Sequence, residues 1–439
     1  MNLFYLIQTR IEKKGNRLFE ISNICVTLIM KIRIRKSTLL IGVMIYFLFN
    51  TPYCFGYISN STVFFYVKMI IGIFLTGLVL LKSRGKIEKN LKFGIEAFLI
   101  PNFLVTVISF VTGLLVYHLS VKPYITQSFL LLIEQWIILI IAYFIFKFEN
   151  ENAIHLVTVV GVISYTTVII HYIYLAGMDG ILHPFNNRVD GVGLEVHGLT
   201  YMFVLILLYY GMTKGIKYIF SNKLLWLVSL YVVLGNKRAA YFGAVIAIFL
   251  YWLLLSFGKK KKIIVTVTTV LTVGFLFGYI VLIHSGYLQE IALLFNIRDS
   301  FRFNFWNYFK EYYTISPSYV GRTLFFTDYY MTLPEIHKLY QFSGQGQMHN
   351  DILRTYIGWG FLPFLYYYIR LLFVNIKKLE KKNVSYAGWI FFPIMVFFIV
   401  IEGFDNMIGT LHFNMMVYLI FFMFVSYYDK DFSKARNIK

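Results

Sequence analysis

Long apolar runs separated by short polar segments dominate the chain. A helix needs roughly 20 mostly apolar residues to cross the hydrocarbon core of a bilayer. Windows of this kind occur at 38–57, 61–81, 93–117, 125–146, 155–176, 198–213, 224–236, 239–257, 263–284, 352–374, 385–402 and 409–427. The seventh is short and merges into the eighth, so a re-entrant hairpin there would change the count. The pattern predicts about twelve spanning helices.

The composition supports this interpretation. Of 439 residues, 59% are hydrophobic, 20% aromatic and only 14% charged. A soluble domain is about 45–50% apolar and about 25% charged. The composition therefore excludes a soluble enzyme, a disordered protein and a coiled coil, and predicts an all-α polytopic membrane protein. Two cysteines exclude a disulfide scaffold and a cysteine-rich metal site.

Basic residues cluster in alternate segments between the windows, which predicts the orientation of the chain. If the N-terminus is cytoplasmic, all of these clusters face the cytoplasm. They are Lys13 to Lys36, Lys82 to Lys92, Lys214 to Lys223, Lys259 to Lys262, Lys377 to Lys382 and Lys430 to Lys439. We therefore interpret the net charge of +20 as a topology signal facing anionic lipids, and expect no nucleic-acid partner.

The same pattern predicts five regions. These are a cytoplasmic N-terminal segment (1–37), a bundle of about nine spans (38–284), a large external loop (285–351), three last spans (352–428) and a cytoplasmic tail (429–439). No cleavage site follows the first span, so we expect no cleaved signal peptide. Translation could start at Met1 or at Met30, with residues 1–29 then an upstream extension.

Three arginines lie in predicted external segments, on one membrane face and at separate entries into the helical bundle. They are Arg188, Arg238 and Arg302, and Arg298 lies close to the last of them. A guanidinium binds phosphate oxygens in a bidentate manner, so several arginines around one pocket suit a diphosphate ligand. An isolated arginine can also contact lipid headgroups or form a loop salt bridge.

His349 lies where the large loop meets the tenth span. Imidazole titrates near neutral pH, so His349 could act as a general base toward a sugar hydroxyl. The alternative is a packing or capping histidine. Asn350 or Asp351 could cap the following helix.

Three charged residues, Lys68, Glu96 and Glu134, fall within apolar windows. Lys68 is the natural partner of either glutamate, and the group could be structural or line a lipid channel. The sequence lacks a P-loop, a zinc-binding HExxH helix and a GxSxG motif. The missing P-loop argues against a nucleotide-driven pump.

In its motifs the chain resembles the bacterial O-antigen polymerase and ligase superfamily, which includes Wzy-type polymerases. Arg188 to Gly191 is similar to the family's Arg-x-x-Gly, and Arg238 lies at its tight external turn, although Lys237 replaces the usual Ser or Thr. Three further segments are similar to motifs of the same family. They are Arg302 to Trp306, Pro317 to Gly321, and His349-Asn350 followed by Gly358 and Gly360.

The resemblance implies an all-α, GT-C-like fold and a metal-independent, inverting glycosyltransferase that needs no cofactor. The donor would be a glycan on undecaprenyl diphosphate, and the acceptor a lipid-linked repeat unit at the outer face of the cytoplasmic membrane. Arg238 and Arg302 would bind the diphosphate, His349 would activate the acceptor, and Arg188 would support the donor. Further substrate contacts are expected from Arg298, Asn350 and Trp306.

The external aromatics Trp306, Tyr312, Tyr313 and Tyr329 could hold sugar rings or form an interfacial belt. Expected partners are lipid-linked oligosaccharides, membrane lipids, a flippase and a chain-length regulator of O-antigen or capsule synthesis. Two alternatives stay open: a ligase that transfers finished glycan to a terminal acceptor, and a lipid-linked oligosaccharide flippase or other transporter.

Overall fold

The computed structural model describes residues 35–54, 61–119, 121–177, 196–257, 260–296, 302–339, 348–381 and 385–426. The chain forms two compact units, residues 1–44 and 45–439. The described part of the first unit is the beginning of one helix, α2 (Lys36–Cys54). The site and the packing described below belong to the second unit.

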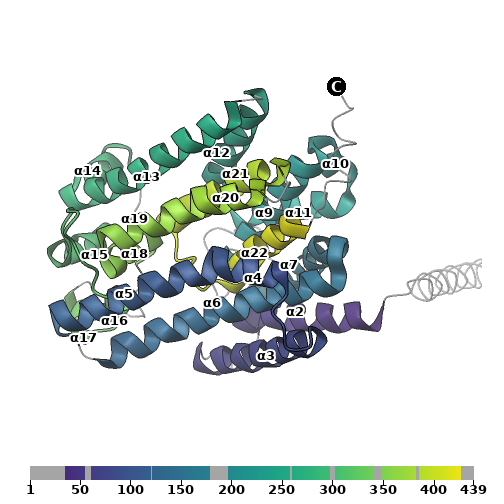
Figure 1. Ribbon diagram of the computed structural model, residues 1–439, viewed down its shortest axis with the longest axis horizontal. Helices are drawn as coiled ribbons and strands as arrows, with labels where there is room; N and C mark the ends of the chain where they lie inside the picture. Colours follow the sequence, from purple (N-terminus) through teal and green to yellow (C-terminus); the bar gives the residue numbers. More distant parts are fainter. Residues whose placement is uncertain are drawn as a thin grey trace, which may run out of the picture. The chain divides into compact units, whose positions relative to one another are not determined.

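Helices account for most of the described chain (Figure 1). The first half contains α3 (Ser61–Lys82), α4 (Lys89–Gly94), the π-helix η1 (Ile95–Leu99), α5 (Ile100–Tyr117), α6 (Val121–Glu149), the 3₁₀-helix η2 (Asn150–Asn152), α7 (Ala153–Ala176), α9 (His197–Lys214) and α10 (Ile216–Ser221). Next come α11 (Lys223–Gly235), α12 (Arg238–Ser256), α13 (Lys261–Ser285), α14 (Tyr287–Leu294), α15 (Arg302–Tyr308), η4 (Phe309–Tyr312), α16 (Phe326–Tyr330) and α17 (Pro334–Leu339). The last are α18 (Asp351–Trp359), α19 (Phe361–Ile369), the π-helix η5 (Arg370–Val374), α20 (Asn375–Lys381), α21 (Ser385–Phe404) and α22 (Leu411–Ser426).

The all-α class is confirmed, because the described residues contain no β-strand and helix occupies most of the described part of every predicted window. Five helical stretches are long and apolar enough to cross a membrane: Phe65–Lys82, Lys89–Tyr117, Thr126–Leu175, Arg238–Ser256 and Lys261–Ser285. Thr126–Leu175 has 50 residues, or about 75 Å at 1.5 Å per residue, and η2 divides it into α6 and α7. The count of twelve spans stays a prediction.

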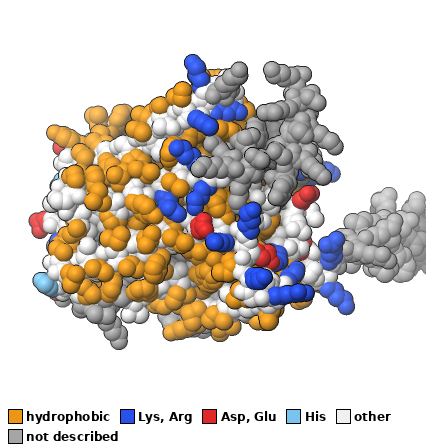
Figure 2. Space-filling view, viewed as in Figure 1, with side chains coloured by type: hydrophobic (Ala, Val, Ile, Leu, Met, Phe, Trp, Pro, Cys, Tyr) orange, Lys and Arg blue, Asp and Glu red, His pale blue; other side chains and the backbone are white. Residues whose placement is uncertain are grey.

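Apolar side chains cover much of the outer surface. Ile70 of α3, Val245 of α12 and Val270 of α13 are all exposed. Figure 2 shows hydrophobic side chains over most of one face, with Lys and Arg gathered toward the right of the view. Such a surface is unfavourable in water and suits a lipid environment.

Helix α22 lies at the centre of the packing. Every residue from Leu411 to Val425 is buried, and the helix packs against α6, α9 and α21. A helix that is apolar and buried on all sides is expected only inside a bundle. The turn between α21 and α22, residues 405–410, is therefore held in place by the helices around it.

The charges predicted within apolar windows are paired. Lys68 forms a salt bridge with Glu134. Oε2 of Glu96, on η1, lies 3.3 Å from Nζ of Lys378, on α20. Because a lone charge in hydrocarbon is costly, these pairs remove a penalty. The structure thus assigns Lys68 to Glu134 rather than to Glu96.

The large loop contacts α18 and α19 through backbone groups. Arg322 N donates to Ile357 O and Thr323 N to Gly358 O, both at 3.0 Å. A Cβ at Gly321 would overlap the backbone of Gly358 and Trp359. The glycines of the Pro317–Gly321 and Gly358–Gly360 motifs thus allow two backbones to meet.

Candidate functional site

Asp405 is the centre of a polar cluster in the turn between α21 and α22. Its side chain is 6% exposed. Oδ2 accepts hydrogen bonds from His197 Nδ1 at 2.7 Å and from the Tyr201 hydroxyl at 3.1 Å. Oδ1 accepts from His349 Nδ1 at 3.3 Å and from the backbone amide of Asn406 at 3.0 Å. Four donors therefore satisfy both carboxylate oxygens.

The tautomer of His197 follows from its two partners. Lys237 Nζ lies 2.8 Å from His197 Nε2, and lysine can only donate. His197 Nε2 must then accept, so the proton is on Nδ1 and is donated to Asp405. In this arrangement His197 links the ammonium group of Lys237 to the carboxylate of Asp405.

His349 lies beside Asp405 and is partly exposed. Its side chain is 36% exposed, and its backbone has φ of +48°, in the left-handed region that is rare for residues other than glycine. A strained conformation of this kind persists only where the surroundings enforce it. Nδ1 donates to Asp405, and in the neutral imidazole this tautomer places the lone pair on Nε2, which can then accept a proton.

Asp351 binds backbone groups close to the contact between His349 and Asp405. Its carboxylate accepts hydrogen bonds from the backbone amides of Met407 and Ile408, the second at 2.7 Å. Arg354 NH1 donates to Asp351 Oδ1 at 3.1 Å and also forms a salt bridge with Asp328 of α16. The chain around His349 is thus fixed to the turn around Asp405 at a second point.

Asn350 is buried and caps α18, as predicted for Asn350 or Asp351. Its Oδ1 accepts from Leu353 N at 3.0 Å, and its Nδ2 donates to the Tyr279 hydroxyl at 3.2 Å. Tyr279 in turn donates to Gly403 O at 2.9 Å. Asn350 therefore supports the cluster and does not point into solvent.

Lys237 reaches the cluster because α11 and α9 approach closely. Gly235, the last residue of α11, lies against Thr200 of α9, where a Cβ would overlap the Thr200 hydroxyl. Asn236 then adopts φ of +42° and reverses the chain before α12. Lys237, the N-cap residue of α12, is consequently buried beside the first turn of α9, where His197 lies.

The predicted arginines divide into three cases. Arg302 begins α15, and its NH1 donates to Phe404 O at 3.1 Å, one residue before Asp405. Arg238 begins α12 beside Lys237 and is exposed. Arg188 and Arg298 lie outside the described residues, so their predicted roles stay predictions.

Two of the four aromatic residues that were predicted to hold sugar rings are buried. Trp306 is 5% exposed and donates from Nε1 to Met348 O at 3.0 Å, directly before His349. Tyr313 is 2% exposed. Tyr312 and Tyr329 are half-buried. In this structure Trp306 supports the segment that carries His349, and its ring is not presented to a ligand.

The charges around Asp405 favour its ionised form. Burial acts to raise the pKa of Asp405, but the hydrogen bonds from His197 and His349 and the charge of Lys237 hold that pKa well below its usual range. With Asp405 ionised, Lys237, Arg238 and Arg302 leave the region with a positive excess, which suits an anionic ligand.

Sequence reasoning missed Asp405, His197 and Lys237 as site residues. His197 directly precedes the window 198–213 and Lys237 lies between the windows 224–236 and 239–257, but no pattern showed that they meet. Asp405 lies in a polar tract, Asp405 to Thr410, between two apolar windows on the predicted external side. Its position among external polar turns was the available signal.

In the described part of the chain, no three His, Cys, Asp or Glu residues are grouped so that they could hold a metal ion. No protein-family model matches the chain, and no curated protein is significantly similar to it.

Proposed function

We propose that the protein is a polysaccharide repeat-unit polymerase of the bacterial cytoplasmic membrane. It would transfer a growing glycan from undecaprenyl diphosphate to a lipid-linked repeat unit. The observation that supports this most strongly is the contact between Asp405 and Nδ1 of the partly exposed His349 side chain, since the neutral ring would then act as a base through Nε2. A carboxylate that orients an imidazole is a recurrent arrangement for general-base catalysis.

The proposed reaction is a single inverting displacement. His349 Nε2 takes the proton of an acceptor sugar hydroxyl as that oxygen attacks the anomeric carbon of the donor. The bond from the anomeric carbon to phosphate oxygen breaks, and its electron pair leaves with undecaprenyl diphosphate. The new negative charge would be stabilised by Arg302 and Lys237, since cations placed where charge develops lower the barrier, and Arg238 would bind the diphosphate of the donor.

The proposal includes a GT-C-like bundle of about twelve spans with both termini in the cytoplasm. Contacts between two segments that the sequence predicts to be cytoplasmic agree with this topology. Lys147 pairs with Glu88, and the Lys82 ammonium lies 4.0 Å from the Phe148 ring centroid. The turn after α3 and the end of α6 thus meet at one end of the bundle, where the sequence predicts the cytoplasm.

The helix ends around Asp405 fit the opposite end of the bundle, which the proposed topology makes external. The beginnings of α9, α12 and α18 and the end of α21 all contribute to the Asp405 cluster. In the proposed topology all four helix ends are external. Substrates would therefore meet the cluster after they have been carried to the outer leaflet, without any contact with nucleic acid or nucleotides.

Reconstitution tests the proposal. Purified protein in liposomes, supplied with undecaprenyl-diphosphate-linked repeat units, should form a ladder of longer lipid-linked glycans with release of undecaprenyl diphosphate. A product attached only to a different terminal acceptor would identify a ligase. Movement of intact substrate across the bilayer, without any new glycosidic bond, would identify a transporter. Either result would remove the polymerase assignment.

A further inference from the structure

A small cavity with both polar and apolar walls lies within the bundle, apart from the Asp405 cluster. Its volume is about 10 Å³, enough for one water-sized occupant. Helices α5, α6, α19, α21 and α22 contribute its walls. Polar lining side chains are Asn102, Gln135, Tyr367, Glu402, Asn414 and Tyr418.

Glu402 is the charged group of this cavity, and it is 1% exposed. The Tyr368 hydroxyl donates to its Oε2 at 3.1 Å. Within the described ranges, no Lys, Arg or His forms a salt bridge with it, whereas Glu134 and Asp351 each have a cationic partner. A buried carboxylate without a countercharge costs several kcal/mol. Glu402 therefore needs a positive charge or a proton.

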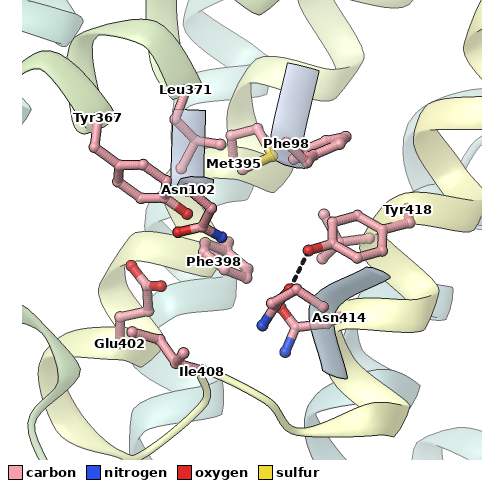
Figure 3. Close-up of a pocket in the computed structure, with 12 residues that line it drawn as sticks. Phe98, Asn102, Tyr367, Leu371, Met395, Phe398, Glu402, Ile408, Asn414 and Tyr418 are labelled. Carbon is pink, nitrogen blue, oxygen red and sulfur yellow. Dashed lines mark hydrogen bonds between the residues drawn. The ribbon is translucent and has the colours of Figure 1, made fainter. Parts of the chain in front are cut away.

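Amide and hydroxyl groups supply the other polar atoms around the cavity. Figure 3 shows the Glu402 carboxylate, the Tyr367 hydroxyl and the Asn102 amide on one side, and Tyr418 on the other. Tyr418 donates to Gln135 Oε1. Asn414 uses its amide NH₂ toward Met407 O and Thr410 O, which leaves its Oδ1 as an acceptor. Amide, hydroxyl and carboxylate oxygens are the ligands of hard cations.

Two π-helical turns flank the same cavity. Phe98 of η1 and Leu371 of η5 line it. The backbone carbonyls at η1 are bound by side chains, since Arg370 NH2 donates to Glu96 O at 3.0 Å and Asn375 Nδ2 donates to Ala97 O at 3.1 Å. Isolated π turns are rare and occur frequently at functional sites. Two of them beside one cavity are an independent indication of a ligand.

We propose that this cavity binds a sodium ion, with Glu402 as its anionic ligand. Close-packed interiors retain few voids, and those that are polar are occupied. One carboxylate balances one positive charge, so a monovalent ion leaves the site neutral, whereas a divalent ion would leave a net charge in a low-dielectric region. The small volume favours a dehydrated sodium ion over the larger potassium ion.

The ion would stabilise the turn that carries Asp405. Ile408 lines the cavity, and its backbone amide is bound by Asp351. Glu402 lies one helical turn before Asp405. Binding of sodium to the folded state alone should therefore raise the stability of the protein by mass action.

The test uses the full-length protein in detergent and requires no glycan substrate. Thermal unfolding is followed while NaCl replaces N-methyl-glucamine chloride at constant ionic strength, and binding of radioactive sodium is measured in parallel. We expect a saturable rise in Tm and about one bound ion per chain. Potassium should give a smaller rise at equal concentration.

Glu402→Gln should lose both the Tm response and the bound ion. Glu335→Gln, which changes an exposed carboxylate of α17, should keep both. A Tm independent of sodium together with no bound ion in the unmodified protein would overturn the proposal, as would a response that persists in Glu402→Gln. A Tm that rises only on acidification would show that Glu402 carries a proton and does not bind sodium. If Glu402→Gln does not fold, the measurement on the unmodified protein still decides.

Discussion

The carboxylate of Asp351 accepts a hydrogen bond from the backbone amide of Ile408 at 2.7 Å. These residues lie two and three positions beyond His349 and Asp405, respectively. The contact therefore fixes the two chain segments whose side chains form the candidate catalytic pair. Arg354 completes the arrangement, since it is buried between Asp351 and Asp328.

Arg354→Met should destabilise the protein by about 3–5 kcal/mol, because it leaves two carboxylates without their cation. Thermal unfolding in detergent measures the change. Lys217→Met, on an exposed position of α10, is the matched control and should stay within about 0.5 kcal/mol of the unmodified protein. Equal stability of the two variants would show that Arg354 does not hold the segments together.

Gly235→Ala should cost about 1–3 kcal/mol, because the new Cβ meets the Thr200 side chain where α9 and α11 pack. The companion change Gly77→Ala meets nothing within 4 Å and should be neutral or stabilising by up to about 1 kcal/mol. Adding Thr200→Ala to Gly235→Ala should recover part of the loss. No recovery would mean that the overlap is not the cause.

Lys237 and Arg238 should contribute differently, although they are neighbours. Lys237 contacts His197, so Lys237→Met should lower kcat about 10²–10³-fold. Arg238 is exposed, so Arg238→Met should act mainly by raising KM for the lipid-linked donor. Steady-state assays of both variants in liposomes separate the two effects. A change in KM alone for Lys237→Met would contradict its placement in the cluster.

Asp405→Asn should lower stability in a pH-dependent manner. The folded pKa of Asp405 is held below its usual range, so its ionised form stabilises the folded state above the unfolded pKa of about 3.9. That contribution is lost as the pH falls from there through the folded pKa. The difference in Tm between the unmodified protein and Asp405→Asn should shrink as the pH falls below about pH 4. A difference that grows on acidification below about pH 4 would reverse the assignment.

The apolar windows predicted the helices well, because a bilayer demands long runs that the sequence displays directly. The polar cluster was harder to predict. Lys237 and Arg238 are adjacent and both basic, yet only the reversal at Asn236 determines which side chain is buried beside His197. Asp405 stands near the end of the chain and meets His197 only through the packing of α21 and α22 against α9. Contacts across such separations leave no local pattern.

His349 was predicted as a base from its residue type and its place before a helix, and the structure adds the carboxylate that orients it. Trp306 illustrates the opposite case. An aromatic residue in an external loop suggests a sugar platform, but the burial of its ring depends on how the loop folds back onto Met348. The Glu402 cavity had no counterpart in the sequence, where Glu402 only ends an apolar window.

The most direct test of the catalytic account is the rate of glycan polymerisation by His349→Ala in liposomes that contain purified lipid-linked repeat units. Positioned general bases contribute about 10²–10⁴-fold, so the variant should lose at least that factor while its Tm and yield stay close to those of the unmodified protein. His155→Ala, which changes an exposed histidine of α7, should polymerise normally. Full polymerisation by His349→Ala would contradict the account.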